Sequence, residues 1–98
     1  MILRTHELRI ARANTMSNTQ YTIKLLLKNG FERLFVDRQF LTFRHKDLNS
    51  LVVTIHRQQE IVDIIADYDF NSLVYHGDLG DVELFRTVLG ETIKYIYD

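Results

Sequence analysis

Apolar residues recur at every second position near the start of this chain, which is the spacing of a strand with one buried face. The run over residues 21–28 ends at Asn29-Gly30, the residue pair that most often closes a two-residue hairpin turn. A hairpin with this turn places Leu25 opposite Leu34, and so joins apolar to apolar on one face. The pattern therefore predicts an antiparallel hairpin made of residues 21–28 and 31–37.

A helix is the alternative for the same stretch. Ser17 and Gln20 have the spacing of a capping box, and Gly30 would then follow the helix as its terminating glycine. A helix over residues 18–29 points the three leucines 25–27 to different sides, so it needs burial almost all round. A strand needs only one buried face. We favour the strand on this ground, and the helix remains the alternative.

Three more apolar segments, each bounded by turn residues, predict strands after this hairpin. They are Phe40–Lys46, Leu51–Arg57 and Glu60–Ala66. The last also matches a helical spacing, but its density of β-branched residues favours a strand. The turn-and-strand sequence of residues 47–52 recurs at residues 69–74, which predicts one more strand ending near residue 76.

Beyond residue 80 the apolar period changes to that of a helix. Asp81 is a suitable N-cap, and Gly90 suggests a kink or a close packing contact inside the helix. The stripe predicted to cover the sheet comprises Val82, Phe85, Leu89, Thr92, Ile93 and Ile96. The whole pattern predicts an α+β fold. It consists of an antiparallel β-meander of roughly four to five strands over residues 20–76, packed against a C-terminal α-helix over residues 81–97.

Composition limits the classes of protein to consider. The 98 residues fit a single domain, 1–98, in which residues 1–15 form a short strand, one helical turn or an N-terminal extension. The chain has no cysteine, which excludes disulfides, thiolate nucleophiles and cysteine-based zinc sites. We see no apolar run of membrane-spanning length and no signal-peptide pattern, so we expect a cytoplasmic protein without membrane contact.

Charge is unevenly distributed along the sequence. Residues 1–57 carry ten Lys and Arg against four Asp and Glu, whereas residues 58–98 carry two against nine. The resulting +6 and −7 together give the formal net charge of −1. The two halves form separate faces for oppositely charged partners, or they neutralise each other within the fold, and the sequence leaves both open.

The outer face of the predicted hairpin is the first candidate binding surface. On it, basic residues alternate with aromatic rings, which suits single-stranded nucleic acid because rings stack on bases and cations follow the phosphates. The candidate residues are Lys24, Lys28, Phe31, Arg33 and Phe35. No RNP-like motif accompanies them. In the alternative, the rings are covered by the N-terminal segment and the cations are simply solvated.

Histidines and carboxylates form no recognised metal or catalytic motif. His45 and His56 would lie on neighbouring strands and could share a face, but zinc needs three or four converging ligands and no H-x-E or HExxH spacing occurs. The acidic residues near the last helix lack the spacing of a calcium loop, and they favour the helix dipole instead; they are Asp67, Asp69, Asp78, Asp81 and Glu83. The three serines lie in turn or cap contexts without a base. We therefore predict no catalytic residue, no metal site and no cofactor.

Surplus apolar side chains favour a binding protein over an enzyme. The strand residues left outside the core stripes are Phe35, Phe40, Val52, Ile61 and Ile65, and the last helix has a second apolar stripe at Leu84, Val88 and Tyr95. We therefore expect a small non-enzymatic protein-interaction module, a regulator or inhibitor, with this helix stripe as its interface. Its partner is another protein or a second copy in a homodimer. A nucleic-acid-binding protein is the alternative. Small domains of this composition also occur as accessory proteins of phages and mobile elements.

Overall fold

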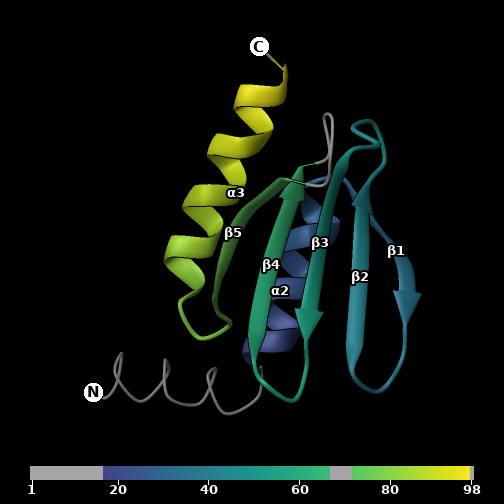
Figure 1. The fold of residues 1–98 in the computed structure, drawn as a ribbon, viewed down its shortest axis with the longest axis vertical. Helices are drawn as coiled ribbons and strands as arrows, with labels where there is room; N and C mark the ends of the chain where they lie inside the picture. Colours follow the sequence, from purple (N-terminus) through teal and green to yellow (C-terminus); the bar gives the residue numbers. More distant parts are fainter. Residues whose placement is uncertain (1–16, 67–71, 98) are drawn as a thin grey trace.

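The computed structural model of this chain describes residues 17–66 and 72–97 (Figure 1). Expectations for residues 1–15 and for the acidic residues 67 and 69 lie outside this part of the chain. A first helix is followed by a run of strands and a last helix. These elements are α2 (Asn18–Lys28), β1 (Phe31–Val36), β2 (Phe40–His45), β3 (Leu51–His56), β4 (Ile61–Ala66), β5 (Ser72–Asp78) and α3 (Val82–Tyr97).

The predicted α+β class is confirmed. The strands form one five-stranded sheet in the order β1-β2-β3-β4-β5, and each pairs antiparallel with the next along the chain. Residues 61–66, for which a helix was the rival, form strand β4. The meander begins at Phe31 rather than near residue 20, because the segment before it is helical.

The predicted strand over residues 21–28 is wrong, and so is the hairpin turn at Asn29-Gly30. The turn that closes such a hairpin requires positive φ at both residues, but Asn29 has φ −98° and only Gly30 is positive, at 88°. The Ser17 side chain accepts a hydrogen bond from the Gln20 backbone N–H at 3.2 Å, and the Gln20 side chain accepts one from the Ser17 N–H at 3.2 Å. This capping box begins α2, and Asn29-Gly30 ends it.

The three consecutive leucines explain why the helix is tolerated. Leu26 is fully buried and Leu25 packs against the core, while Leu27 is left 43% exposed. The helix therefore does not need burial on every side. The expectation that it would need such burial was the reason for preferring a strand. One exposed leucine is an ordinary surface feature, and the cap and the packed face outweigh it.

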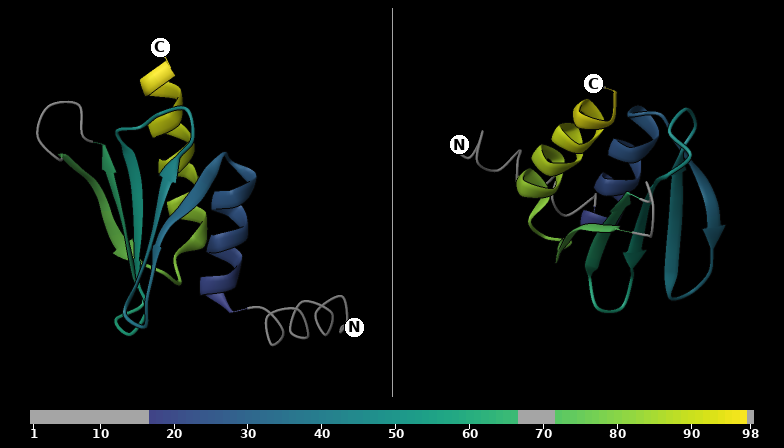
Figure 2. Two further views of the ribbon diagram at one scale, coloured as in Figure 1. Left: turned by 90° about the vertical axis from the view of Figure 1, so that its right-hand side faces the viewer. Right: turned by 45° about the horizontal axis from the view of Figure 1, so that its top comes forward.

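Both helices lie on the same face of the sheet, as the two views in Figure 2 show. Alternate residues of β2, β3 and β4 are buried beneath them, which gives the regular in-and-out burial of these strands. The core beneath the helices consists of Leu26, Phe31, Leu41, Phe43, Leu51, Val53, Ile55, Val62, Ile64, Ala66, Leu79, Phe85 and Leu89. The opposite face of the sheet, here called the open face, carries no helix of the described chain (Figures 1 and 2).

Candidate interaction surface

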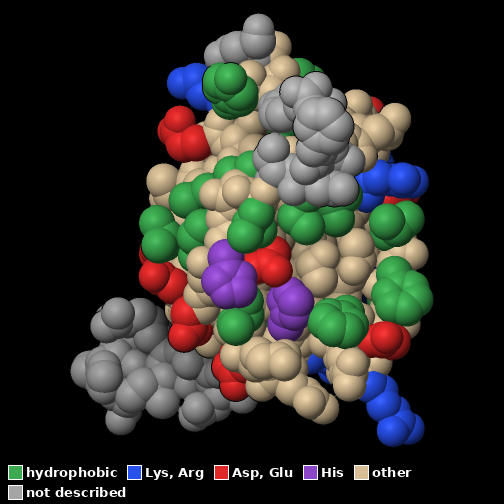
Figure 3. Space-filling model, in the orientation of Figure 1, with side chains coloured by type: hydrophobic (Ala, Val, Ile, Leu, Met, Phe, Trp, Pro, Cys, Tyr) green, Lys and Arg blue, Asp and Glu red, His purple; other side chains and the backbone are tan. Residues whose placement is uncertain are grey.

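The open face of the sheet is the candidate functional surface. It is formed by the residues that alternate with the core positions, so β2, β3 and β4 present Phe40, Thr42, Arg44, Val52, Thr54, His56, Ile61, Asp63 and Ile65 there. Figure 3 views this face, with two histidines and an adjacent acidic side chain in the middle of hydrophobic side chains. Every one of the surplus strand residues predicted from the sequence therefore belongs to one surface, since Phe35 of β1 also faces this side, opposite Thr42.

A network of three side chains on three adjacent strands forms the polar centre of the open face. Asp63 of β4 lies between His56 of β3 and His76 of β5. The distance from His56 Nε2 to Asp63 Oδ2 is 2.8 Å, and that from His76 Nδ1 to Asp63 Oδ1 is 2.5 Å. The Asp63 side chain is only 15% exposed, whereas that of His76 is 57% exposed. The ring of Phe40 meets the His56 ring edge to face, with centroids 5.2 Å apart. The contact with the Phe40 ring and the hydrogen bond to the Asp63 carboxylate together fix the orientation of the His56 side chain.

This geometry determines what the network offers to a ligand. An ionised carboxylate only accepts hydrogen bonds, so each imidazole donates to Asp63 through the ring nitrogen that faces it. The other ring nitrogens, Nδ1 of His56 and Nε2 of His76, are then acceptors when the rings are neutral. The centre of the open face thus presents acceptor nitrogens beside a carboxylate charge, surrounded by apolar side chains.

His45 and His56 do lie on neighbouring strands, β2 and β3, but they do not share a face. His45 occupies a core-facing position of β2 and is 5% exposed, with its ring edge against Phe31. Its Nδ1 accepts hydrogen bonds from the backbone N–H groups of Asp47, at 3.1 Å, and Leu48, at 3.2 Å. His45 is therefore a structural residue of the β2–β3 turn. Within residues 17–66 and 72–97, no group of three or more histidine and acidic side chains is arranged to hold a metal ion.

The residues predicted to bind nucleic acid do not form one surface. Lys24 and Lys28 lie on α2, whereas Phe31 is 1% exposed in the core. Arg33 and Phe35 point to opposite sides of β1, because Arg33 pairs with core-facing Phe43 and Phe35 with Thr42. The basic and aromatic surface depended on the hairpin that helix α2 replaces. Nucleic-acid binding itself stays a prediction.

The predicted interface stripe of α3 lies beside its buried stripe. Phe85, Leu89 and Thr92 are buried, as the sequence predicts for the core-facing side. Leu84 is 47% exposed, Val88 packs partly against the core, and Tyr95 is 75% exposed. Of the two features expected at Gly90, a kink or a close packing contact, the close contact is not found among the described residues: apart from the neighbouring backbone of α3, no described atom lies within 4 Å of where its Cβ would be.

The junction between β5 and α3 contains the only side-chain N or O atom of the described residues that is buried without a hydrogen-bond partner, the Tyr75 hydroxyl. The ring of Tyr75 contacts Phe85 of α3, with centroids 6.2 Å apart. Desolvation raises the pKa of Tyr75, and the nearby carboxylates of Asp81 and Asp78 raise it further. Asp78 also accepts from the Gly80 N–H at 2.7 Å, so this acid shapes the turn before α3.

The sequence contained part of the signal for the His56–Asp63–His76 network. A short turn after Arg57 fixes the register of β3 with β4, in which His56 faces Ile61 and Thr54 faces Asp63. This register alone places His56 and Asp63 on one face. The position of His76 depends on a bulge in the β4–β5 pair, where the register shifts between Ile64 and Ile65, and no residue pattern announces it.

No protein-family model, curated protein or solved structure matches this chain. Within the described residues, neither helix has the length and apolar character needed to cross a membrane. Function must therefore be inferred from the surface itself.

Proposed function

We propose that this chain is a non-enzymatic protein-interaction module that binds a protein partner through the open face of its sheet. The observation that carries this proposal is the make-up of that face. The uncovered face of an antiparallel sheet is usually polar, but here Phe40, Val52, Ile61 and Ile65 surround a small polar centre. Apolar area around a few fixed polar groups is the usual anatomy of a protein-binding surface.

The partner's chemistry follows from the hydrogen bonds of the centre. Because His56 and His76 already donate to Asp63, the free ring nitrogens and the carboxylate favour a partner that supplies donors. A lysine, arginine or hydroxyl set among apolar side chains satisfies this requirement. The network also holds the rings in place before binding, which lowers the entropy that association costs. A cytoplasmic location belongs to the same proposal, since a chain without cysteine has no disulfide to form in an oxidising compartment.

Site-specific photo-crosslinking tests this function. A benzophenone amino acid is placed at Thr54, which faces Asp63 at the centre of the open face, or at Glu91, an exposed position on α3 that serves as the control. In extracts of the source cell, we expect one protein to be linked from Thr54 but not from Glu91, and excess unlabelled chain to suppress the adduct. That protein, once purified, should bind the chain about tenfold more weakly when the chain carries Thr54→Arg.

Two outcomes would contradict the proposal. One is an identical set of adducts from both positions, which would indicate non-specific proximity. The other is a purified partner whose affinity is unchanged by Thr54→Arg, which would place its binding surface elsewhere on the molecule.

A further inference from the structure

In the part of the chain that the structure describes, strand β1 leaves one row of backbone groups unpaired. Within residues 17–66 and 72–97 it pairs only with β2, at the edge of the sheet. The Asp37 N–H donates to the Phe40 carbonyl at 3.0 Å and the Gly30 carbonyl accepts from the Lys46 N–H at 2.9 Å, so these positions face β2. By the alternation of an antiparallel ladder, Val36 and Arg33 direct their backbone groups to the free edge.

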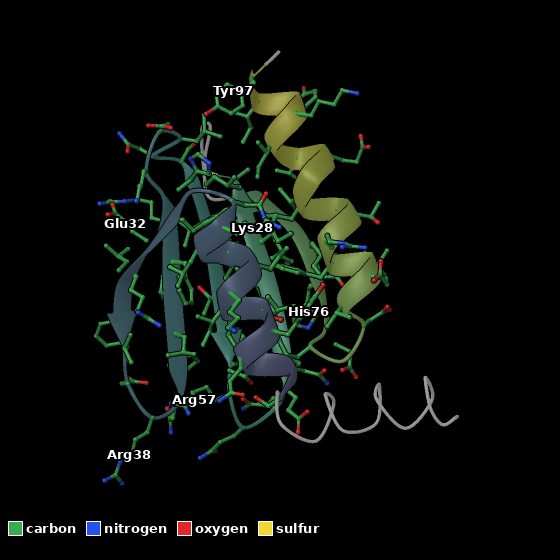
Figure 4. All side chains as sticks on the ribbon, turned by 180° about the vertical axis from the view of Figure 1, so that it is seen from behind. Lys28, Glu32, Arg38, Arg57, His76 and Tyr97 are labelled. Carbon is green, nitrogen blue, oxygen red and sulfur yellow. The ribbon has the colours of Figure 1, made fainter. Side chains whose placement is uncertain are left out.

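This edge is also apolar at its centre. Leu34, Phe35 and Val36 are 49%, 54% and 54% exposed. Charged residues flank them on both sides, and Figure 4 shows Glu32 beside β1 and Arg38 at the end of its hairpin with β2. An unpaired edge with exposed apolar side chains is a template for pairing with another strand.

A bulge in β1 decides which strand fits. The register shifts between Arg33 and Phe35, so Leu34 is the extra residue and lies with Phe35 opposite Thr42, on the open-face side. Arg33 and Val36 pair with core-facing residues of β2 and so point to the helix side. From residue 33 to residue 36 the side chains point to the helix side, open side, open side and helix side. This order is the same in both directions along the strand.

We infer that β1 pairs antiparallel with β1 of a second copy, about a two-fold axis between Leu34 and Phe35, to join the two sheets into one. In this register each side chain meets one on the same face: Leu34 meets Phe35 of the second copy, and Arg33 meets Val36. Arg33 and Val36 are also the residues whose backbone groups face the edge, so they form the hydrogen-bonded pairs. Leu34 and Phe35 of both copies gather into an apolar cluster on the open face, next to the surface proposed to bind a partner.

The same register also determines how dimerisation depends on salt concentration. Glu32 meets Asp37 of the second copy on the open-face side, because Glu32 pairs with Arg44 and Asp37 with Phe40 within each copy. Like charges in opposite positions are unfavourable, and salt screens them. Moving the register by one residue would bring Glu32 opposite Arg38 and Arg33 opposite Asp37, but it would also place helix-side residues against open-side residues. Dimerisation by the inferred register therefore strengthens with added salt, whereas the charge-matched register would weaken.

Sedimentation equilibrium of the full chain, from about 1 μM to about 1 mM, tests the dimer. We expect a monomer–dimer equilibrium whose dissociation constant falls as salt rises. Val36→Pro removes an N–H that the single copy does not use, and should raise the constant at least about tenfold with little change in melting temperature. Val36→Ala keeps this N–H and is the matched control. Leu34→Ser tests the apolar cluster at an exposed position.

Crosslinking tests the register, because the chain contains no cysteine of its own. Directly opposite residues of a non-hydrogen-bonded pair have Cα atoms about 4.5 Å apart, within the disulfide range of about 4.4–6.8 Å. Mixed Leu34→Cys and Phe35→Cys chains should therefore oxidise to a heterodimer faster than either variant forms a homodimer. Faster Phe35→Cys homodimers would instead identify the charge-matched register and overturn the inferred one.

A strictly monomeric chain, or a dimer indifferent to both Val36→Pro and Leu34→Ser, would overturn the pairing. If the chain is monomeric and its β1 variants no longer bind some other protein, the edge pairs with that protein and the inferred dimer is overturned. The dimer does not depend on the open face binding a partner. The crosslinking from Thr54 and the sedimentation of β1 variants can therefore fail separately.

Discussion

The buried hydroxyl of Tyr75 allows a direct test of how β5 packs against α3. Tyr75 lies opposite core-facing Ile64, its ring contacts Phe85, and its hydroxyl oxygen is buried without a hydrogen-bond partner among the residues that the structure describes. Leaving a buried polar group unsatisfied costs about 1–3 kcal/mol, and replacing it by an apolar group of the same shape removes that cost. We therefore predict that Tyr75→Phe stabilises the protein by about 1–2 kcal/mol. At roughly 4–8 °C per kcal/mol for a domain of this size, the melting temperature rises by about 5–15 °C.

The difference between the two proteins should grow at alkaline pH. Burial and the carboxylates of Asp81 and Asp78 raise the pKa of Tyr75 above its ordinary value of 10.0. A group whose pKa is raised in the folded state contributes stability below its unfolded pKa and loses that contribution as pH rises through the folded pKa. The wild-type protein should therefore lose stability above about pH 10 faster than the Tyr75→Phe variant does.

Thermal unfolding followed by circular dichroism, at neutral pH and again above pH 10, measures both effects. Tyr97→Phe is the matched control, because this tyrosine is 60% exposed and its hydroxyl is not in the core. If Tyr75→Phe lowers the melting temperature at neutral pH, the hydroxyl has a partner that stabilises it, and the account of the β5–α3 junction is refuted.

Three further substitutions test the local packing and the corrected first helix. Gly77→Ala should destabilise the protein by about 1–3 kcal/mol, because the added Cβ would lie 2.3 Å from the Tyr75 hydroxyl oxygen. Gly90→Ala should instead stabilise α3 by about 1 kcal/mol, since apart from the neighbouring helix backbone no described atom lies within 4 Å of the added Cβ. Chemical denaturation measures the change in unfolding free energy of each of these two variants. Equal changes would contradict the packing described around Gly77 and Gly90. Ser17→Ala should cost about 1 kcal/mol by removing the cap of α2, measured the same way, and an unchanged stability would mean that the capping box does not hold the helix end.

The local sequence pattern was sufficient to predict an element and its buried face where one face of the element is buried and the turns beside it are short. The alternation in β2, β3 and β4 fixed both the strands and the side of the sheet each residue occupies, because a one-residue slip would move every core side chain into water. The same holds for α3, whose predicted core stripe is the one that packs on the sheet. The alternation of side chains between the two faces of each strand was therefore enough to place Phe40, Ile61 and Ile65 together on the open face.

The stretch around Asn29-Gly30 shows where local pattern fails. The glycine fits a hairpin turn and a helix end equally well, since both need its positive φ, and the alternating apolar residues fit both elements. The choice between them depends on what covers the sheet. As a helix, residues 18–28 put Thr22 and Leu26 into the core, and Gly30 lets the chain pass close to the His45 ring.

The sequence by itself determined a meander of short strands and an amphipathic last helix, because hydrophobic periodicity and turn residues act over a few positions of the chain. The tertiary structure alone decided that both helices cover one face, that the bulge in the β4–β5 pair brings His76 to Asp63, and that β1 bulges at Leu34. These features depend on register between strands and on competition for a single core, which involve residues distant in sequence. The open face and the β1 edge, where the proposed functions lie, are what that competition left uncovered.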